Sequence, residues 1–121
     1  MKLLILFAMI FAHIVDDYYL QGILAKMKQK KWWEENAPDK MYRYDYIVAL
    51  ITHAFSWSFM ITVPTLLVSN EYIIMCIFII GNTMLHAYID DGKANKRRIN
   101  LIVDQLCHMI QIIGLWMTIV V

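Results

Sequence analysis

Charged residues are scarce in this sequence of 121 residues, and the hydrophobic stretches between them are long. Asp, Glu, Lys and Arg make up 17% of the residues and hydrophobic side chains 60%, whereas a soluble domain is about a quarter charged and nearly half apolar. The length fits one domain, residues 1–121. The composition therefore favours a protein surrounded by lipid. The formal net charge of +1 gives no reason to expect a nucleic acid as partner.

Cysteines are also few, and neither has a close partner in the sequence. Cys76 and Cys107 both lie inside apolar runs. A disulfide framework needs paired cysteines in a loop-rich extracellular fold, and a zinc knuckle needs closely spaced pairs. We expect both to pack as small apolar thiols. No small-x-small cleavage site follows the apolar N-terminal run, so we interpret that run as retained in preference to a signal peptide.

Four hydrophobic segments are each long enough to cross a bilayer as a helix, which needs about 20 residues. They are residues 3–21, 46–68, 72–90 and 99–121, and none carries Lys or Arg. The sequence thus predicts an all-α fold, an integral membrane four-helix bundle that forms one transmembrane domain. The longest connection, residues 22–45, holds a basic run followed by Trp32 and Trp33, which is typical of a segment in the lipid headgroup layer.

Basic residues are distributed unevenly over the connections. They gather in residues 22–45 and 91–98, while the connection around residue 70 and the C-terminal end carry none. Because basic loops tend to stay in the cytoplasm, we expect both termini on the non-cytoplasmic side. The predicted location is the inner, cytoplasmic membrane, crossed several times. The expected partner is the bilayer with its anionic headgroups, and assembly into a homo-oligomer stays open.

All four histidines lie in predicted spans, and three aspartates stand four residues from one of them. The pairs are His13 with Asp17, His86 with Asp90, and Asp104 with His108, while His53 stands alone. Residues four apart share a helix face, and ionisable groups in a membrane normally face the protein interior. At a rise of about 1.5 Å per residue, all except Asp90 fall roughly 6–14 Å from the cytoplasmic helix ends. Agreement in depth between antiparallel helices predicts one cluster.

Imidazole and carboxylate groups together are ligands for zinc, iron or manganese. We therefore expect a divalent metal, zinc first, held by this set: His13, Asp17, His53, His86, Asp90, Asp104 and His108. The three aspartates are also the candidates for catalysis, as bridging or orienting groups or as a general base on metal-bound water. Two alternatives stay open: a network of His–Asp hydrogen bonds without metal, and haem held by two histidines.

A further set of polar residues is expected to contact a substrate or an anion: Lys93, Arg97, Arg98, Gln21 and Gln105. The three cations could hold a phosphate near the metal, or they could only orient the chain on anionic lipid. Asp16 and Asp91 neighbour the inward aspartates, and α-helical spacing predicts that they point to other faces, at the interface.

The order of these motifs resembles a family of small bacterial and phage membrane proteins of unknown function. The motifs are H-x-x-x-D at 13–17, His53, H-x-x-x-D at 86–90 and D-Q-x-x-H at 104–108, and they extend over nearly the whole chain. In its transmembrane His and Asp residues that family is distantly similar to membrane-bound metal-dependent hydrolases, by analogy of composition and without a shared motif.

The leading hypothesis is a membrane-embedded metal-binding protein that acts as a metal-dependent hydrolase. Its substrate would be a lipid or a lipid-linked phosphate or ester at the cytoplasmic leaflet. A divalent cation transporter is an alternative, although the outer half of the predicted bundle offers no polar path. A non-catalytic membrane module with a structural metal site is another, so the sequence leaves open whether the protein is an enzyme.

Overall fold

The computed structural model describes residues 1–121 and contains helices and their connections, with no strand, so the all-α prediction is confirmed. Shorter helical turns extend two of the helices: a π-helix at Val15–Leu20 and a 3-10 helix at Val63–Leu67. The α-helices are α1 (Lys2–Ile14), α2 (Leu24–Met27), α3 (Lys30–Asn36), α4 (Asp45–Thr62), α5 (Tyr72–Ala94) and α6 (Leu101–Ile119).

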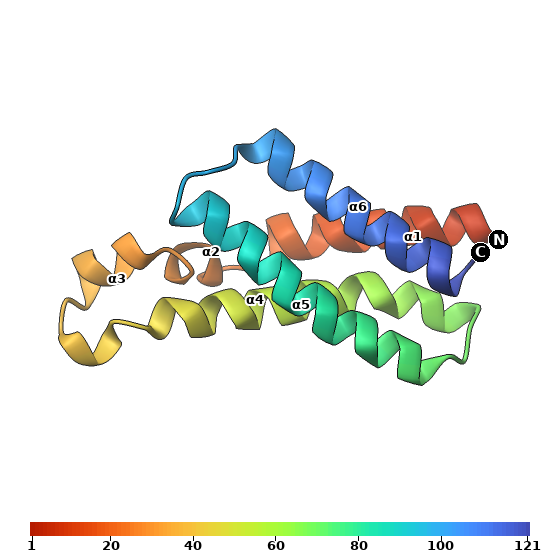
Figure 1. The fold of residues 1–121 in the computed structure, drawn as a ribbon, viewed down its shortest axis with the longest axis horizontal. Coiled ribbons are helices and arrows are strands. Elements are labelled where there is room, and N and C mark those ends of the chain that lie inside the picture. The colour runs from red at the N-terminus through yellow and green to blue at the C-terminus, as the bar shows by residue number, and fades with distance from the viewer.

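Four helical segments are long and apolar enough to cross a membrane: Lys2–Leu20, Lys40–Leu67, Tyr72–Ala94 and Leu101–Ile119. Helix α1 contacts α4 and α6, and α5 contacts the same two helices. Both chain termini lie at one end of the molecule, and α2 and α3 lie at the other end (Figure 1). At the shared end, the Lys2 ammonium donates to the Val121 carbonyl at 3.2 Å, and the Trp116 indole donates to the Lys2 carbonyl at 2.9 Å.

The outward surface of these helices is apolar. Large side chains such as Phe11, Ile73, Ile102 and Ile110 are exposed along them. Soluble monomers rarely expose contiguous apolar patches of this kind, whereas lipid tails accommodate them without cost. Length, hydropathy and this outward apolar surface together indicate a membrane protein.

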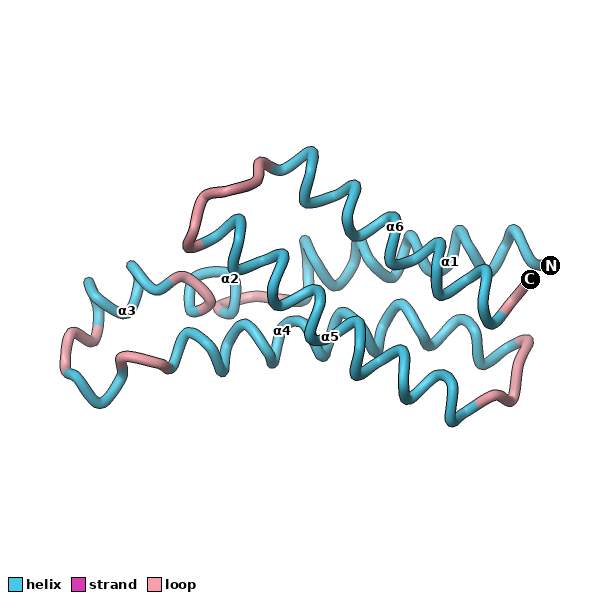
Figure 2. Tube along the Cα trace, viewed as in Figure 1, coloured by secondary structure: helices cyan, strands magenta, loops and turns pink.

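The interior is divided into an apolar half and a polar half. Near the termini it is filled by one hydrophobic cluster: Ile5, Met9, Trp57, Ile61, Ile112, Leu115 and Val120. Ser58, Thr62 and Thr65 are buried beside it, and each hydroxyl donates to a backbone carbonyl of its own helical segment. The turn from α4 to α5 lies at this end, and the α5–α6 loop lies at the opposite end (Figure 2).

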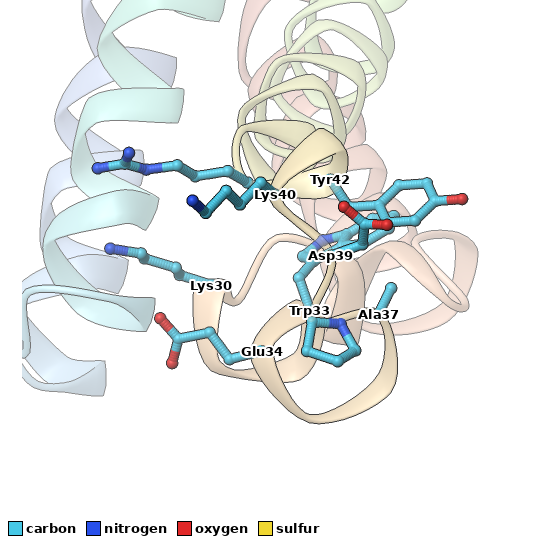
Figure 3. A pocket seen from close by; sticks show the side chains of 9 residues that line it. Lys30, Trp33, Glu34, Ala37, Asp39, Lys40 and Tyr42 are labelled. Carbon is cyan, nitrogen blue, oxygen red and sulfur yellow. The ribbon is translucent and has the colours of Figure 1, made fainter.

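The connection between α1 and α4 is folded against the other helices. Gly22 has a φ of +51°, a left-handed conformation that glycine adopts without steric cost, and the chain turns there so that α2 contacts α4. The Trp33 indole donates to the Met27 carbonyl at 2.6 Å. A polar hollow lies beside Trp33, with Lys30 and Lys40 extending to one side and Tyr42 to the other (Figure 3).

Candidate metal centre

Each of the four membrane-length segments contributes one buried histidine to the polar half: His13, His53, His86 and His108. The Nε2 atoms of His53 and His86 lie 3.2 Å apart, and the rings of His86 and His108 stack with centroids 4.2 Å apart. The imidazoles from all four segments therefore lie together, as the sequence predicts.

Carboxylates complete two sets of three potential ligands that share one imidazole. The first set is Asp17, His53 and His86, and the second is His86, Asp90 and His108, each with its ligand atoms within 4.8 Å of one another. His53 Nε2 lies 3.3 Å from Asp17 Oδ1 and 3.3 Å from Asp90 Oδ2. The two sets form one continuous centre, because they share His86 and because Asp90 of the second set contacts His53 of the first.

The spacing of these atoms fits a tetrahedral ion. Zinc bonds of about 2.0–2.1 Å at tetrahedral angles place neighbouring ligand atoms roughly 3.3 Å apart, and the separations at His53 are 3.2 and 3.3 Å. His108 Nε2 and Asp104 Oδ1 also lie 3.3 Å apart, yet neither atom has a hydrogen-bond partner. These two buried atoms therefore have the same separation as the ligand atoms at His53.

The charge of the centre is not balanced by its own side chains. Four carboxylates are buried: Asp16, Asp17, Asp90 and Asp104. Lys28 pairs with Asp90 and Lys93 pairs with Asp104, each at 2.7 Å. Asp16 accepts from Ser56 and Asp17 from Gln105, both neutral donors. Two buried negative charges thus have no ammonium partner, which is costly in a membrane.

Lys28 is a residue of this centre that the sequence pattern did not indicate. We interpreted it as part of a basic run on lipid, but its side chain is 11% exposed and its Nζ contacts Asp90. Asn95, at the end of α5, donates to the Lys28 carbonyl at 3.0 Å and accepts from the Lys30 amide at 2.7 Å. These contacts join residues more than 60 positions apart, and no local signal marks them.

The expectation that Asp16 points away from the interior is wrong. It is 1% exposed, and its Oδ2 lies 3.9 Å from His53 Nδ1. The cause is the π-helix at Val15–Leu20. Hydrogen bonds of a π-helix run from residue i to i+5, so its turn holds more residues than an α-turn and the inward face shifts. Asp16 and Asp17 are consequently both buried. Asp91 is partly exposed and pairs with Lys96 at 3.0 Å.

His13 lies in the cluster, but both of its ring nitrogens have other partners. The Trp57 indole donates to Nδ1 at 2.7 Å, and Nε2 lies 2.9 Å from Gln105 Oε1. Because Nδ1 accepts a hydrogen bond from Trp57, Nε2 carries the ring hydrogen and donates it to Gln105 Oε1. The amide of Gln105 also lies 3.1 Å from Asp104 Oδ2. The structure therefore does not bring His13 into either ligand set and gives Gln105 the role of a linker between carboxylates.

Replacing Trp57 with Phe should destabilise the protein through His13. Trp57 is fully buried and its ring stacks on His86 with centroids 4.2 Å apart. Phe keeps an aromatic ring there but leaves His13 Nδ1 without a donor, which should lower the free energy of unfolding by about 1–3 kcal/mol. Denaturation in detergent measures this, with Trp116→Phe as the control at a more exposed indole. Equal losses in both variants would contradict the assignment.

The remaining predicted residues are divided between two pockets. Gln21, Lys93 and Arg97 line one pocket together with Ala25, Lys28, Gln29, Asp90 and Ala94. Arg98 lines a different pocket with Tyr88, Lys96 and Cys107. The hollow beside Trp33 shares no residue with the centre (Figure 3). Only the first pocket reaches a ligand carboxylate, that of Asp90.

A comparison with protein families finds one match, a family described as protein of unknown function (DUF3307), over residues 5–121. No curated protein and no solved structure matches the chain. The resemblance to a family of unknown function is confirmed, while a bacterial or phage origin and the distant similarity to hydrolases stay predictions.

Proposed function

The chain belongs to the DUF3307 family, and we propose from the geometry of its buried centre that it is a membrane-embedded, metal-dependent hydrolase. In this proposal it spans the cytoplasmic membrane as a four-helix bundle with both termini on the non-cytoplasmic side. The substrate is a lipid or lipid-linked phosphate or ester at the cytoplasmic leaflet. The basic residues near α2, α3 and the α5–α6 loop support this orientation.

One observation carries the metal assignment: Asp16 and Asp17 are buried beside His53, and neither is paired with a lysine or an arginine. A divalent cation supplies the two missing positive charges and replaces the hydrogen bonds that water would otherwise give. Two imidazolium ions could supply the same charge, and metal analysis separates these cases. Histidine and carboxylate donors at tetrahedral spacing favour zinc, with iron or manganese as alternatives.

The residues divide into those that would hold the ion and those that would orient them. The two ligand sets comprise five residues: Asp17, His53, His86, Asp90 and His108. Asp16 Oδ2 lies 3.9 Å from the other ring nitrogen of His53, and an approach to hydrogen-bond distance there would fix the tautomer of a ligand histidine. A bound metal would lower the pKa of water and polarise a substrate oxygen. Asp104, which belongs to neither set, is then the nearby carboxylate for accepting a proton.

The position of the pocket that reaches Asp90 favours a hydrolase over a transporter. The pocket that reaches Asp90 lies between the chain around Gln21 and the end of α5. On the other side of the centre, the Gln111 side-chain amide donates to Asn82 Oδ1 at 3.2 Å. Beyond this pair, the hydrophobic cluster fills the half near the termini. An ion in transit would have to cross that cluster without ligands.

The test is elemental analysis followed by a turnover assay on full-length protein purified without a histidine tag. We expect bound divalent metal and metal-dependent phosphate or acid release from lipid substrates in mixed micelles. Asp90→Asn removes a ligand carboxylate and should lower the turnover rate by more than about 100-fold. Asp91→Asn is the matched control, because Asp91 pairs with Lys96 near the surface. Metal without turnover would instead indicate a structural module, and absence of metal a hydrogen-bonded network.

A further inference from the structure

The pocket beside the metal centre combines a ligand-sized volume with a polar lining. Its volume is about 400 Å³, within the roughly 300–1,000 Å³ of small-molecule sites. Six of its eight lining residues are polar: Gln21, Lys28, Gln29, Asp90, Lys93 and Arg97. Gln21 Oε1 is buried and has no hydrogen-bond partner. The composition is that of a site for a polar ligand at the inner edge of the membrane-length helices.

Two of the three cations in this pocket connect it to the metal centre. Lys28 Nζ and Lys93 Nζ each make one hydrogen bond, to Asp90 and Asp104 respectively, both at 2.7 Å. An ammonium group has three donors, so each lysine keeps two donors after its carboxylate is satisfied. These donors are held in place by the ion pairs and are available to an anion in the pocket.

The third cation, Arg97, is positioned by an uncommon backbone conformation. Its φ is +51°, and it is the one non-glycine residue of the chain with positive φ. The Arg98 amide donates to the Gly92 carbonyl at 2.8 Å and holds this turn after α5. Left-handed backbone in a residue without the freedom of glycine is strained and persists where the surroundings fix it. In this chain the turn places Arg97 in the lining of the pocket beside the centre and Arg98 in the lining of a different pocket.

We infer that this pocket binds a phosphate dianion, as a phosphate monoester or the terminal phosphate of a diphosphate, and not a neutral ester. The inference rests on the proposed hydrolase and names its substrate class. Three cations and one carboxylate line the pocket, and that carboxylate, Asp90, is itself a candidate metal ligand. Lys28 and Lys93 are paired with Asp90 and Asp104, whereas Arg97 has no carboxylate partner. Arg97 offers the planar fork that matches phosphate oxygens, and the two lysines offer point charges. A phosphate held there lies next to the metal ligands.

Free phosphate and a lipid headgroup carry the same group, so the experiment has two arms. Metal-loaded full-length protein in detergent is titrated with inorganic phosphate and with pyrophosphate by calorimetry. The same protein in nanodiscs is compared with phosphatidic acid and phosphatidylcholine by native mass spectrometry. Binding in both arms identifies phosphate as the recognised group. Preference for phosphatidic acid of more than tenfold over the soluble anions assigns the lipid as the source.

Arg97→Gln should weaken phosphate binding by about tenfold or more, because a hydrogen bond to a charged group is lost, and Arg97→Lys should restore part of it. Arg98→Gln, the neighbouring cation in the other pocket, should change affinity less than twofold. Equal losses in the two glutamine variants, or unchanged affinity in Arg97→Gln, would overturn the assignment. Metal content is measured in parallel. If the purified protein contains no metal but still binds phosphate through Arg97, the proposed hydrolase is overturned and the phosphate site stands.

Discussion

Replacing His86 with Gln is expected to abolish stoichiometric metal binding. His86 belongs to both ligand sets and lies at their common point, 3.2 Å from His53 Nε2 and stacked on His108. Loss of a residue that merely orients a ligand typically weakens metal affinity 10- to 100-fold, so loss of this shared imidazole should exceed about 100-fold. Elemental analysis and competition with a zinc chelator measure the change.

His13→Gln is the matched control for this variant. Like His86, His13 is a buried histidine that contacts Trp57, but its ring nitrogens are bonded to Trp57 and Gln105. Metal content should therefore stay close to that of the unmodified protein, with affinity lowered by tenfold or less. If both variants lost the metal to the same extent, His13 would be a ligand and the two sets of three would be the wrong description of the centre.

The parts of this centre that the sequence predicts are those built on regular α-helix. His86 and Asp90 lie one turn apart on α5, and Asp104 and His108 lie one turn apart on α6. Because neither helix deviates from α-helical spacing between them, the i, i+4 pattern places each pair on one face. The cost of burying ionisable groups in a membrane then turns both faces inward. Hydrophobic length alone is likewise sufficient to identify the four membrane-length segments.

The contacts that sequence reasoning did not predict depend on features without a local signal. Asp16 is turned inward by a π-helix, which has no distinctive residue pattern in this chain. Lys28 reaches Asp90 only because Gly22 redirects the chain and Asn95 binds the backbone of the α2–α3 connection. Trp57 and Gln105 engage both nitrogens of His13 across helix boundaries. A change of helix type decides the position of Asp16, and tertiary contacts decide the positions of Lys28 and His13.

Replacing Lys28 with Met should strongly destabilise the metal-free protein. The Lys28 side chain is 11% exposed and its partner Asp90 is 2% exposed. Removing one member of a buried ion pair leaves an uncompensated charge and typically lowers the free energy of unfolding by about 3–5 kcal/mol. Lys31→Met is the control, because the Lys31 side chain is 72% exposed in its pair with Glu35, and such pairs contribute about 1 kcal/mol or less.

The effect of Lys28→Met should depend on metal, and this dependence separates the two accounts of the centre. When a divalent ion binds at Asp90, it neutralises the carboxylate that Lys28 otherwise neutralises. Denaturation measured with added zinc should then show a much smaller difference between Lys28→Met and the unmodified protein than denaturation measured with chelator. If the centre is a hydrogen-bonded network that binds no zinc, the difference between the two proteins would be the same with zinc as with chelator. Lys28 would thus act as the counter-ion of Asp90 in the metal-free protein, and a bound metal would take over this role.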